Sequence, residues 1–137
     1  MPLVTVVVPN FNHALYLPKR IESVLNQSFA NIELILLDDC SNDNSRAVME
    51  RYAEQDARIS LLFNETNSGN TFRQWDKGLK MAKGKYIWIA ESDDFAEYSF
   101  LSELVPLLEA NDDIMLAYAN SNVIDEYGTA SSTTADW

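Results

Sequence analysis

Five continuous apolar runs, separated by stretches with helical periodicity, constrain the fold of this sequence more than any other feature. Continuous runs, as opposed to alternating ones, are typical of strands buried on both faces of a sheet. Helices between consecutive strands make those strands parallel. We therefore predict an α/β fold, a Rossmann-like three-layer sandwich with a mostly parallel sheet and helices on both faces. The predicted strands are residues 3–9, 33–38, 59–63, 85–90 and 114–119.

The connections between these runs predict four helices. In the first, apolar residues recur on one face from Leu17, with Pro18 in the first turn, and the helix is expected to end near Ser28. The second helix falls within residues 41–55, where cap residues precede Val48 and Tyr52 on one face. A fourth helix is expected over about 97–109. Pro106 should kink or shorten it, because proline removes a backbone hydrogen bond.

The third helix has a predicted buried face of Phe72, Trp75, Leu79 and Ala82. Gly84 follows at a position typical of a helix C-terminal glycine. We expect this helix to pack on the sheet through its aromatic and aliphatic side chains.

At 137 residues, the chain is long enough for one domain. We predict one domain over residues 1–128, truncated on its C-terminal side, and a loop or frayed tail over 129–137. The first apolar run lacks the basic region and cleavage site of a signal peptide, and no run reaches the roughly 18 residues of a membrane span. We expect a cytoplasmic protein, with a peripheral position at the inner face of the membrane as an alternative.

The net charge and the counts of cysteine and histidine exclude several classes of ligand and site. Ten Lys and Arg residues against 21 Asp and Glu residues give a formal net charge of -11, which repels nucleic acid. One cysteine, Cys40, and one histidine, His13, exclude an intramolecular disulfide and the usual Cys/His zinc site. A phosphate ligand would therefore need a local correction from a divalent cation or a well-placed arginine.

The loops that follow the first four strands are all polar: "PNFNH", "DDCSND", "NETNSGN" and "ESDD". In open parallel sheets, ligands bind at the carboxyl ends of the strands. Helix capping is an alternative explanation, since each loop precedes a helix. Asp94 with Glu97, and Thr71 with Gln74, have the spacing of capping boxes.

Capping alone does not account for Glu91, Asp93 and Asp94, because three carboxylates within four residues repel one another unless they are protonated or neutralised. Mg²⁺ and Mn²⁺ prefer such oxygen ligands and often bridge them to substrate phosphates. The cluster thus indicates a metal-dependent site for a diphosphate. The neighbouring pair Asp38 and Asp39 is available to hydrogen-bond a base or ribose.

Two further residues have alternative roles. Phe11 is placed either to stack on a nucleobase or to fill the core, and Arg73 either to bind a phosphate or to lie on a solvated helix face. The glycine-rich dinucleotide and P-loop motifs are absent from the sequence. Cys40 is expected to be a small buried residue and not a nucleophile, since no histidine stands near a later strand end.

Several motifs in order resemble the family-two glycosyltransferases of GT-A fold. "VTVVVPNFNHALYLPKRIESVLNQSFANIELILLDDCSNDNS" resembles that family's opening. "NETNSGNTFRQWDKGLKMAKGKYIWIAESDD" is similar to its Asn-x-Gly loop, its helix ending in Ala-x-Gly, and its strand closed by an Asp-x-Asp type metal motif. The resemblance spans roughly residues 3–128. Cys40 stands where the family commonly has Gly, Ala or Asn.

Carried over to this sequence, the resemblance implies a nucleotide pocket and a metal site. The implied nucleotide-binding residues are Pro9, Phe11, Asn12, Asp38, Asp39, Arg73 and Asp93. Asp39 would hydrogen-bond the base, commonly uracil, with Asp38 in support. Arg73 would lie near the diphosphate, although the family's usual Arg-Asn pair is Arg-Gln here. Asp94 would bind the metal directly, Asp93 the ribose or metal, and Glu91 is one methylene longer than the family's aspartate.

The function implied is transfer of a sugar, with inversion, from a nucleotide-diphospho-sugar to a hydroxyl group. The donor would be UDP-linked, the cofactor Mn²⁺ or Mg²⁺, and the acceptor a glycan or lipid-linked molecule in cell-surface polysaccharide synthesis. The general base is expected beyond Trp137. Two alternatives remain: a non-catalytic nucleotide-binding module of the same fold, and a phosphoacceptor domain of receiver type. The receiver type needs an acidic pair after its first strand, where this chain has "PNFN".

Overall fold

The computed structural model describes residues 1–125 and 127–134, and the chain divides into two compact units, Met1–Tyr98 and Ser99–Trp137. The elements of the first unit are β1 (Val4–Asn10), α1 (Leu17–Leu25), β2 (Ile32–Asp38), α2 (Ser45–Gln55), β3 (Ile59–Phe63), α3 (Thr71–Met81) and β4 (Tyr86–Ile89). The second unit contains α4 (Phe100–Glu109), β5 (Asn122–Ile124) and β6 (Ala130–Thr133). In the described residues, no helix has the length and hydropathy needed to cross a membrane.

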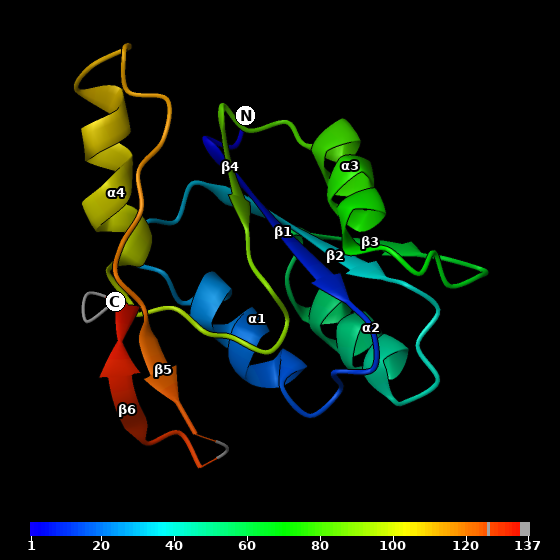
Figure 1. Cartoon of the computed structure of the whole chain (residues 1–137). Coiled ribbons are helices and arrows are strands. Elements are labelled where there is room, and N and C mark those ends of the chain that lie inside the picture. Colours follow the sequence, from blue (N-terminus) through cyan, green and yellow to red (C-terminus); the bar gives the residue numbers. More distant parts are fainter. Residues whose placement is uncertain (126, 135–137) are drawn as a thin grey trace. The chain divides into compact units, whose positions relative to one another are not determined.

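The first unit confirms the predicted α/β fold. Its four strands are parallel in the order β3-β2-β1-β4, with α1 and α2 on one face of the sheet and α3 on the other (Figure 1). Every residue of β1 is buried, and so are six of the seven in β2, as expected for central strands covered on both sides. Pro18 lies in the first turn of α1, which ends three residues earlier than Ser28. α4 continues past Pro106 to Glu109.

The fifth predicted strand is wrong. Residues 114–119 form no strand, and Met115, Leu116 and Tyr118 within this run are 77–89% exposed. An apolar run becomes a strand only where a neighbouring backbone pairs with it, and no described strand does so here.

Of the predicted loop or frayed tail, residues 129–137, the last three residues, 135–137, lie outside the described residues. The described part contains β6, which pairs with β5 in an antiparallel hairpin. Asp125 begins its turn, because its Oδ1 accepts hydrogen bonds from the backbone N–H groups of Tyr127 and Thr129. Gly128 adopts a φ of 83°, a backbone conformation that glycine adopts without a steric penalty. Local turn chemistry therefore produced strands that the apolar pattern did not indicate.

The predicted buried face of α3 is also wrong. Its buried residues are Gln74 and Gly78, whereas Phe72 is 68% and Leu79 49% exposed. A Cβ atom at Gly78 would lie 2.4 Å from Val7 Cγ1, so the absent side chain allows α3 to approach β1 closely. The contact of α3 with the sheet thus depends on a glycine, and the periodicity of apolar residues does not identify a glycine as a contact residue.

Gly84 does not cap α3, which ends at Met81 with Ala82 in an extended conformation. The Gly84 N–H instead donates to Thr5 Oγ1 over 2.8 Å, and a Cβ atom there would lie 2.5 Å from the Thr5 backbone nitrogen. Gly84 therefore lets the chain pass close to the start of β1.

Neither predicted capping box forms. The N-cap of α3 is Asn70, whose side chain accepts from the Phe72 N–H over 2.9 Å. α4 begins at Phe100 after Ser99, so Asp94 and Glu97 both precede that helix. The acidic residues after β4 are therefore free of a capping role.

Asp38, at the carboxyl end of β2, joins three parts of the fold. Its fully buried carboxylate accepts hydrogen bonds from Asn10 Nδ2 at 3.0 Å, from the Ser41 N–H at 3.0 Å and from Arg46 Nε at 2.9 Å. Burial by itself would raise the pKa of Asp38, but the hydrogen bonds from Ser41, Arg46 and Asn10 together lower it below its ordinary value. Asp38 thus connects β1, β2 and α2 in its charged form.

We predict that Gly78→Ala destabilises the protein by about 1–3 kcal/mol, because the new methyl group overlaps Val7 in a packed core. Leu79→Ala on the same helix should cost less than about 1 kcal/mol, since Leu79 is half exposed. Urea unfolding of both variants gives the two free energies. A larger loss for Leu79→Ala would contradict the helix orientation described above.

The lowered pKa of Asp38 predicts a specific loss of stability in acid. Its contribution is complete above about pH 5, and it disappears as the pH falls through the unfolded-state value of about 4 towards the lower folded-state pKa. Between about pH 5 and pH 3, the free energy of unfolding should therefore fall more steeply in the wild type than in Asp38→Asn. Urea unfolding at several pH values measures both slopes, and equal slopes in the two proteins would contradict the lowered pKa.

Candidate functional site

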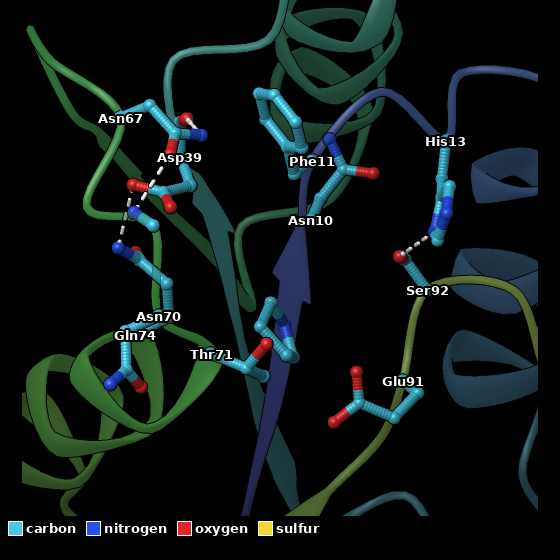
Figure 2. A pocket seen from close by; sticks show the side chains of 12 residues that line it. Asn10, Phe11, His13, Asp39, Asn67, Asn70, Thr71, Gln74, Glu91 and Ser92 are labelled. Atoms are coloured by element: carbon cyan, nitrogen blue, oxygen red, sulfur yellow. Dashed lines mark hydrogen bonds between the residues drawn. The ribbon is translucent and has the colours of Figure 1, made fainter.

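A pocket of about 370 Å³ lies at the carboxyl ends of the sheet strands. Its lining comes from the ends of β1, β2 and β4 and from the loop and first turn of α3 (Figure 2). Ligands of open parallel sheets bind at this edge. The lining residues are Pro9, Asn10, Phe11, His13, Asp39, Asn67, Gly69, Asn70, Thr71, Gln74, Glu91 and Ser92.

One wall of the pocket is organised by the Asp39 carboxylate. Its Oδ1 accepts hydrogen bonds from the Ser68 N–H at 2.8 Å, from Gln74 Nε2 at 2.9 Å and from Asn64 Nδ2. Its Oδ2 accepts from Ser68 Oγ at 2.8 Å. Since a carboxylate oxygen has two lone pairs, Oδ2 retains capacity for a donor from a ligand.

The loop before α3 is folded against the same residue. Asn67 Nδ2 donates to the Asp39 backbone carbonyl at 2.8 Å, and Asn67 Oδ1 accepts from the Gly69 N–H at 2.7 Å. Gly69 has a φ of 64°, in the left-handed region. The Asn-x-Gly motif of the sequence is therefore a turn that places Asn67 and Asn70 beside the pocket.

The opposite wall consists of His13, Glu91 and Ser92, which face Asp39, Asn67 and Gln74 across the pocket (Figure 2). His13 Nδ1 and Ser92 Oγ are 2.7 Å apart and share a hydrogen bond, which joins the loop after β1 to the loop after β4. The two walls of the pocket thus come from chain segments that lie far apart in the sequence.

Glu91 belongs to this wall and not to the exposed part of the acidic cluster. Its Oε1 accepts a hydrogen bond from Trp75 Nε1 at 3.2 Å. Burial raises the pKa of Glu91 above its ordinary value, and the charges of Asp93 and Asp94 raise it further, while the Trp75 hydrogen bond and Arg20 oppose the rise. Glu91 is therefore held towards the pocket by an indole N–H.

Asp93 and Asp94 are exposed and follow a turn in which the Asp94 N–H donates to the Glu91 carbonyl at 3.3 Å. Among the described residues, no group of three or more His, Cys, Asp or Glu side chains is arranged to hold a metal ion. Two adjacent exposed carboxylates nevertheless suit Mg²⁺ or Mn²⁺, because these ions commonly take one or two carboxylates and complete their shell with water and substrate phosphates. The donor set therefore fits a cation shared with a ligand, with Asp93 and Asp94 as the residues that would hold it.

Arg20 is not among the site residues predicted from the sequence, and it lies buried against this acidic loop. It projects from α1, is 3% exposed, and donates from Nε to the Glu91 carbonyl at 2.7 Å. Burial lowers the pKa of the Arg20 guanidinium, and the charges of Asp94, Asp93 and Glu91 partly offset that effect. The available signal was a charged residue three positions after Leu17, on the apolar face of the helix.

Of the residues implied for nucleotide binding, Pro9, Phe11 and Asp39 line the pocket. Phe11 is 43% exposed, so it is not a core filler and its ring is available for stacking. Asn12 adopts a φ of 58° and does not line the pocket; its Oδ1 accepts from the Asn42 N–H at 2.7 Å. Asn12 thus shapes the loop without facing the cavity.

The remaining implied residues, Asp38, Arg73 and Asp93, lie outside the lining. Arg73 is exposed in the first turn of α3, with Nη1 3.4 Å from the Ser68 carbonyl. Cys40, expected to be buried, is partly exposed, and its Sγ contacts the Glu65 carbonyl at 3.5 Å. Its φ of 62° lies in the left-handed region, which Gly and Asn adopt more readily than other residues.

The chain is similar in sequence to known glycosyltransferases. It is 37% identical over 110 residues to Glycosyltransferase GlyG of Streptococcus pneumoniae, covering 80% of this chain and 36% of that protein. It is 30% identical over 131 residues to a Campylobacter jejuni GalNAc(5)-diNAcBac-PP-undecaprenol beta-1,3-glucosyltransferase, covering 96% of this chain and 41% of that protein. The chain thus spans little more than a third of the length of these relatives.

Among solved structures, residues 1–349 of Staphylococcus aureus TarS in complex with UDP superpose with a TM-score of 0.74 at 27% identity, covering 80% of this chain and 32% of that one. The same protein has been solved with UDP-GlcNAc. The TarS comparison confirms the predicted GT-A fold. The model of the family described as Glycosyl transferase family 2 matches residues 5–134. A match over nearly the whole chain, with two related glycosyltransferases beside it, shows that this protein belongs to glycosyl transferase family 2.

Proposed function

We propose that this chain is the donor-binding part of an inverting glycosyltransferase that transfers a sugar from a UDP-linked donor to a hydroxyl group. The observation that carries the proposal is the pocket with a carboxylate on each of two facing walls, Asp39 on one side and Glu91 on the other. The two ends of a nucleotide diphosphate suit these two walls. Its base donates a hydrogen bond to a carboxylate, and its phosphates attract a cation that carboxylates also bind.

The base is proposed to bind beside Asp39 and Phe11. Uracil presents one N–H donor between two carbonyl groups, and Asp39 Oδ2 is an acceptor with remaining capacity. Phe11 directly follows β1 and is 43% exposed, so its aromatic ring is available for a base to stack on. The complexes of TarS with UDP and UDP-GlcNAc support this assignment by similarity.

The diphosphate is proposed to lie towards the Glu91–Asp94 loop, where Asp93 and Asp94 would hold Mn²⁺ or Mg²⁺. The bound cation would offset the negative charge that grows on the departing diphosphate. Arg73, in the first turn of α3, is available for a phosphate oxygen. The chain's own contribution is to bind and orient the donor so that its reacting carbon faces the acceptor.

The acceptor, the general base and the cellular setting are also proposals. The Campylobacter jejuni relative, whose name specifies a PP-undecaprenol-linked substrate, supports a lipid-linked acceptor and a role in cell-surface polysaccharide synthesis. Such an acceptor would place the enzyme in the cytoplasm, peripheral to the inner face of the membrane. Because the relatives are more than twice as long as this chain, we place the general base beyond Trp137.

The non-catalytic module of the same fold remains the second candidate. It is favoured by the lack, among the described residues, of a three-membered metal cluster. It predicts nucleotide binding that does not depend on a metal. The receiver-type alternative is wrong, because the family match excludes it.

We predict that the protein binds UDP in the presence of Mn²⁺ and that Asp94→Ala weakens this binding at least tenfold and removes its dependence on Mn²⁺. Asp94 is exposed, so the loss reflects the missing ligand and not a disturbed core. Titration calorimetry with and without Mn²⁺ measures both effects. The matched control Asp112→Asn removes a carboxylate outside the pocket and should bind like the wild type.

Asp39→Asn should weaken UDP binding to a similar extent at any metal concentration, because an amide NH₂ would replace an acceptor oxygen. Its cost in stability should be small, about 1 kcal/mol, because the remaining amide oxygen in the Oδ1 position keeps the hydrogen bonds from the Ser68 N–H and Gln74. Folded wild-type protein that binds no UDP with Mn²⁺ present would contradict the proposed function. UDP binding that Mn²⁺ does not change would instead support the non-catalytic module.

A further inference from the structure

The Arg20 guanidinium sits in an unusual environment for a positive charge. It is 3% exposed, its Nη1 is buried and has no hydrogen-bond partner, and its Cζ lies 5.6 Å from the centre of the Trp88 ring. One hydrogen bond, from Nε to the Glu91 carbonyl, ties it to the loop after β4. A buried arginine with an unsatisfied N–H group costs free energy, so its retention in the core calls for a compensating interaction.

That compensation comes from the acidic loop. The loop follows β4 and is bonded to Arg20 through the Glu91 carbonyl, and the negative charges of Asp94, Asp93 and Glu91 partly offset the lowering of the Arg20 pKa by burial. Without a cation, these carboxylates would repel one another. Arg20 therefore supplies a fixed positive charge beside the loop to which a divalent ion would bind.

We propose that Arg20 is a built-in counter-cation of the Glu91–Asp94 loop: it keeps the loop in shape without a metal and lowers the loop's affinity for a free divalent ion, so that Mn²⁺ or Mg²⁺ is retained together with the nucleotide diphosphate. Arg20 is thus a positioning residue, since it acts through the Glu91 carbonyl and through its charge. The inference rests on the proposed metal site at Asp93 and Asp94.

Two physical effects follow from the buried charge. Arg20 and the divalent ion have the same sign, so each weakens the binding of the other to the same carboxylates. A diphosphate brings negative charge of its own, which attracts the divalent ion and offsets the repulsion by Arg20. The ion is therefore held weakly by the loop alone and more tightly once the diphosphate is bound, and by linkage each ligand strengthens the other by the same factor.

The test compares Arg20→Gln, which is neutral but keeps an N–H donor, with Arg20→Lys, which keeps the charge. Mn²⁺ affinity is measured by calorimetry in the absence and in the presence of UDP. In Arg20→Gln, we expect Mn²⁺ to bind about tenfold more tightly both without and with UDP, because the removed charge repels the ion in either state. Arg20→Lys should stay close to the wild type in both measurements.

Arg58→Gln is the matched control, because Arg58 is also a hydrogen-bonded arginine but pairs with Asp56, away from the pocket. It should change stability without changing the affinity for Mn²⁺. A folded Arg20→Gln that binds Mn²⁺ no more tightly than the wild type would overturn the inference, and so would an equal gain in Arg20→Lys. Both outcomes require a wild type that binds Mn²⁺ and UDP together, so they differ from a failure of the proposed function.

If Arg20→Gln is unfolded without metal, millimolar Mn²⁺ should restore its cooperative thermal unfolding, because the ion replaces the missing charge. Asp94→Ala in the same background should prevent that restoration. An unfolded Arg20→Gln that Mn²⁺ does not refold would count against the inference.

Discussion

The end of β2 holds the site together, because its two successive carboxylates are each satisfied by a different layer of the fold. Neighbouring residues of a strand point to opposite sides of a sheet. Asp38 accordingly bonds Arg46 of α2, whereas Asp39, directly after the strand, bonds Gln74 of α3. Both helices are thereby fixed to one point of the central sheet. The wall of the pocket at Asp39 is then held in place by hydrogen bonds from α3 and from the loop before it.

The parallel sheet is the part of the fold that could be predicted from the sequence. Strands buried on both faces need no alternation, so four of the five apolar runs became the strands of the parallel sheet. The positions after those strands were predicted to carry the site, and Asp39, Phe11 and Glu91 do line the pocket. Both inferences follow from the geometry of parallel sheets, which is independent of details along the chain.

Other features could not be predicted because they depend on contacts between distant residues. The inner face of α3 is set by the missing side chain of Gly78 against Val7, which no hydrophobic periodicity records. Likewise, Arg20 and Glu91 meet although they are 71 positions apart, as do His13 and Ser92 over 79 positions. Sequence patterns describe which residues prefer burial, but they do not say which buried residues touch.

The exposed run at residues 114–119 also has a consequence for how the protein behaves in solution. Met115, Leu116 and Tyr118 are exposed, and the segment combines apolar and aromatic residues without a lysine, an arginine or a proline to interrupt it. Unpaired segments of this composition add readily to similar segments of other molecules. Two copies of this chain therefore have a ready route to edge-to-edge association through residues 114–119, opposed mainly by the mutual repulsion of two chains that each carry a net charge of -11. Because salt screens that repulsion, a preparation of this protein should remain monodisperse more readily at low than at high ionic strength.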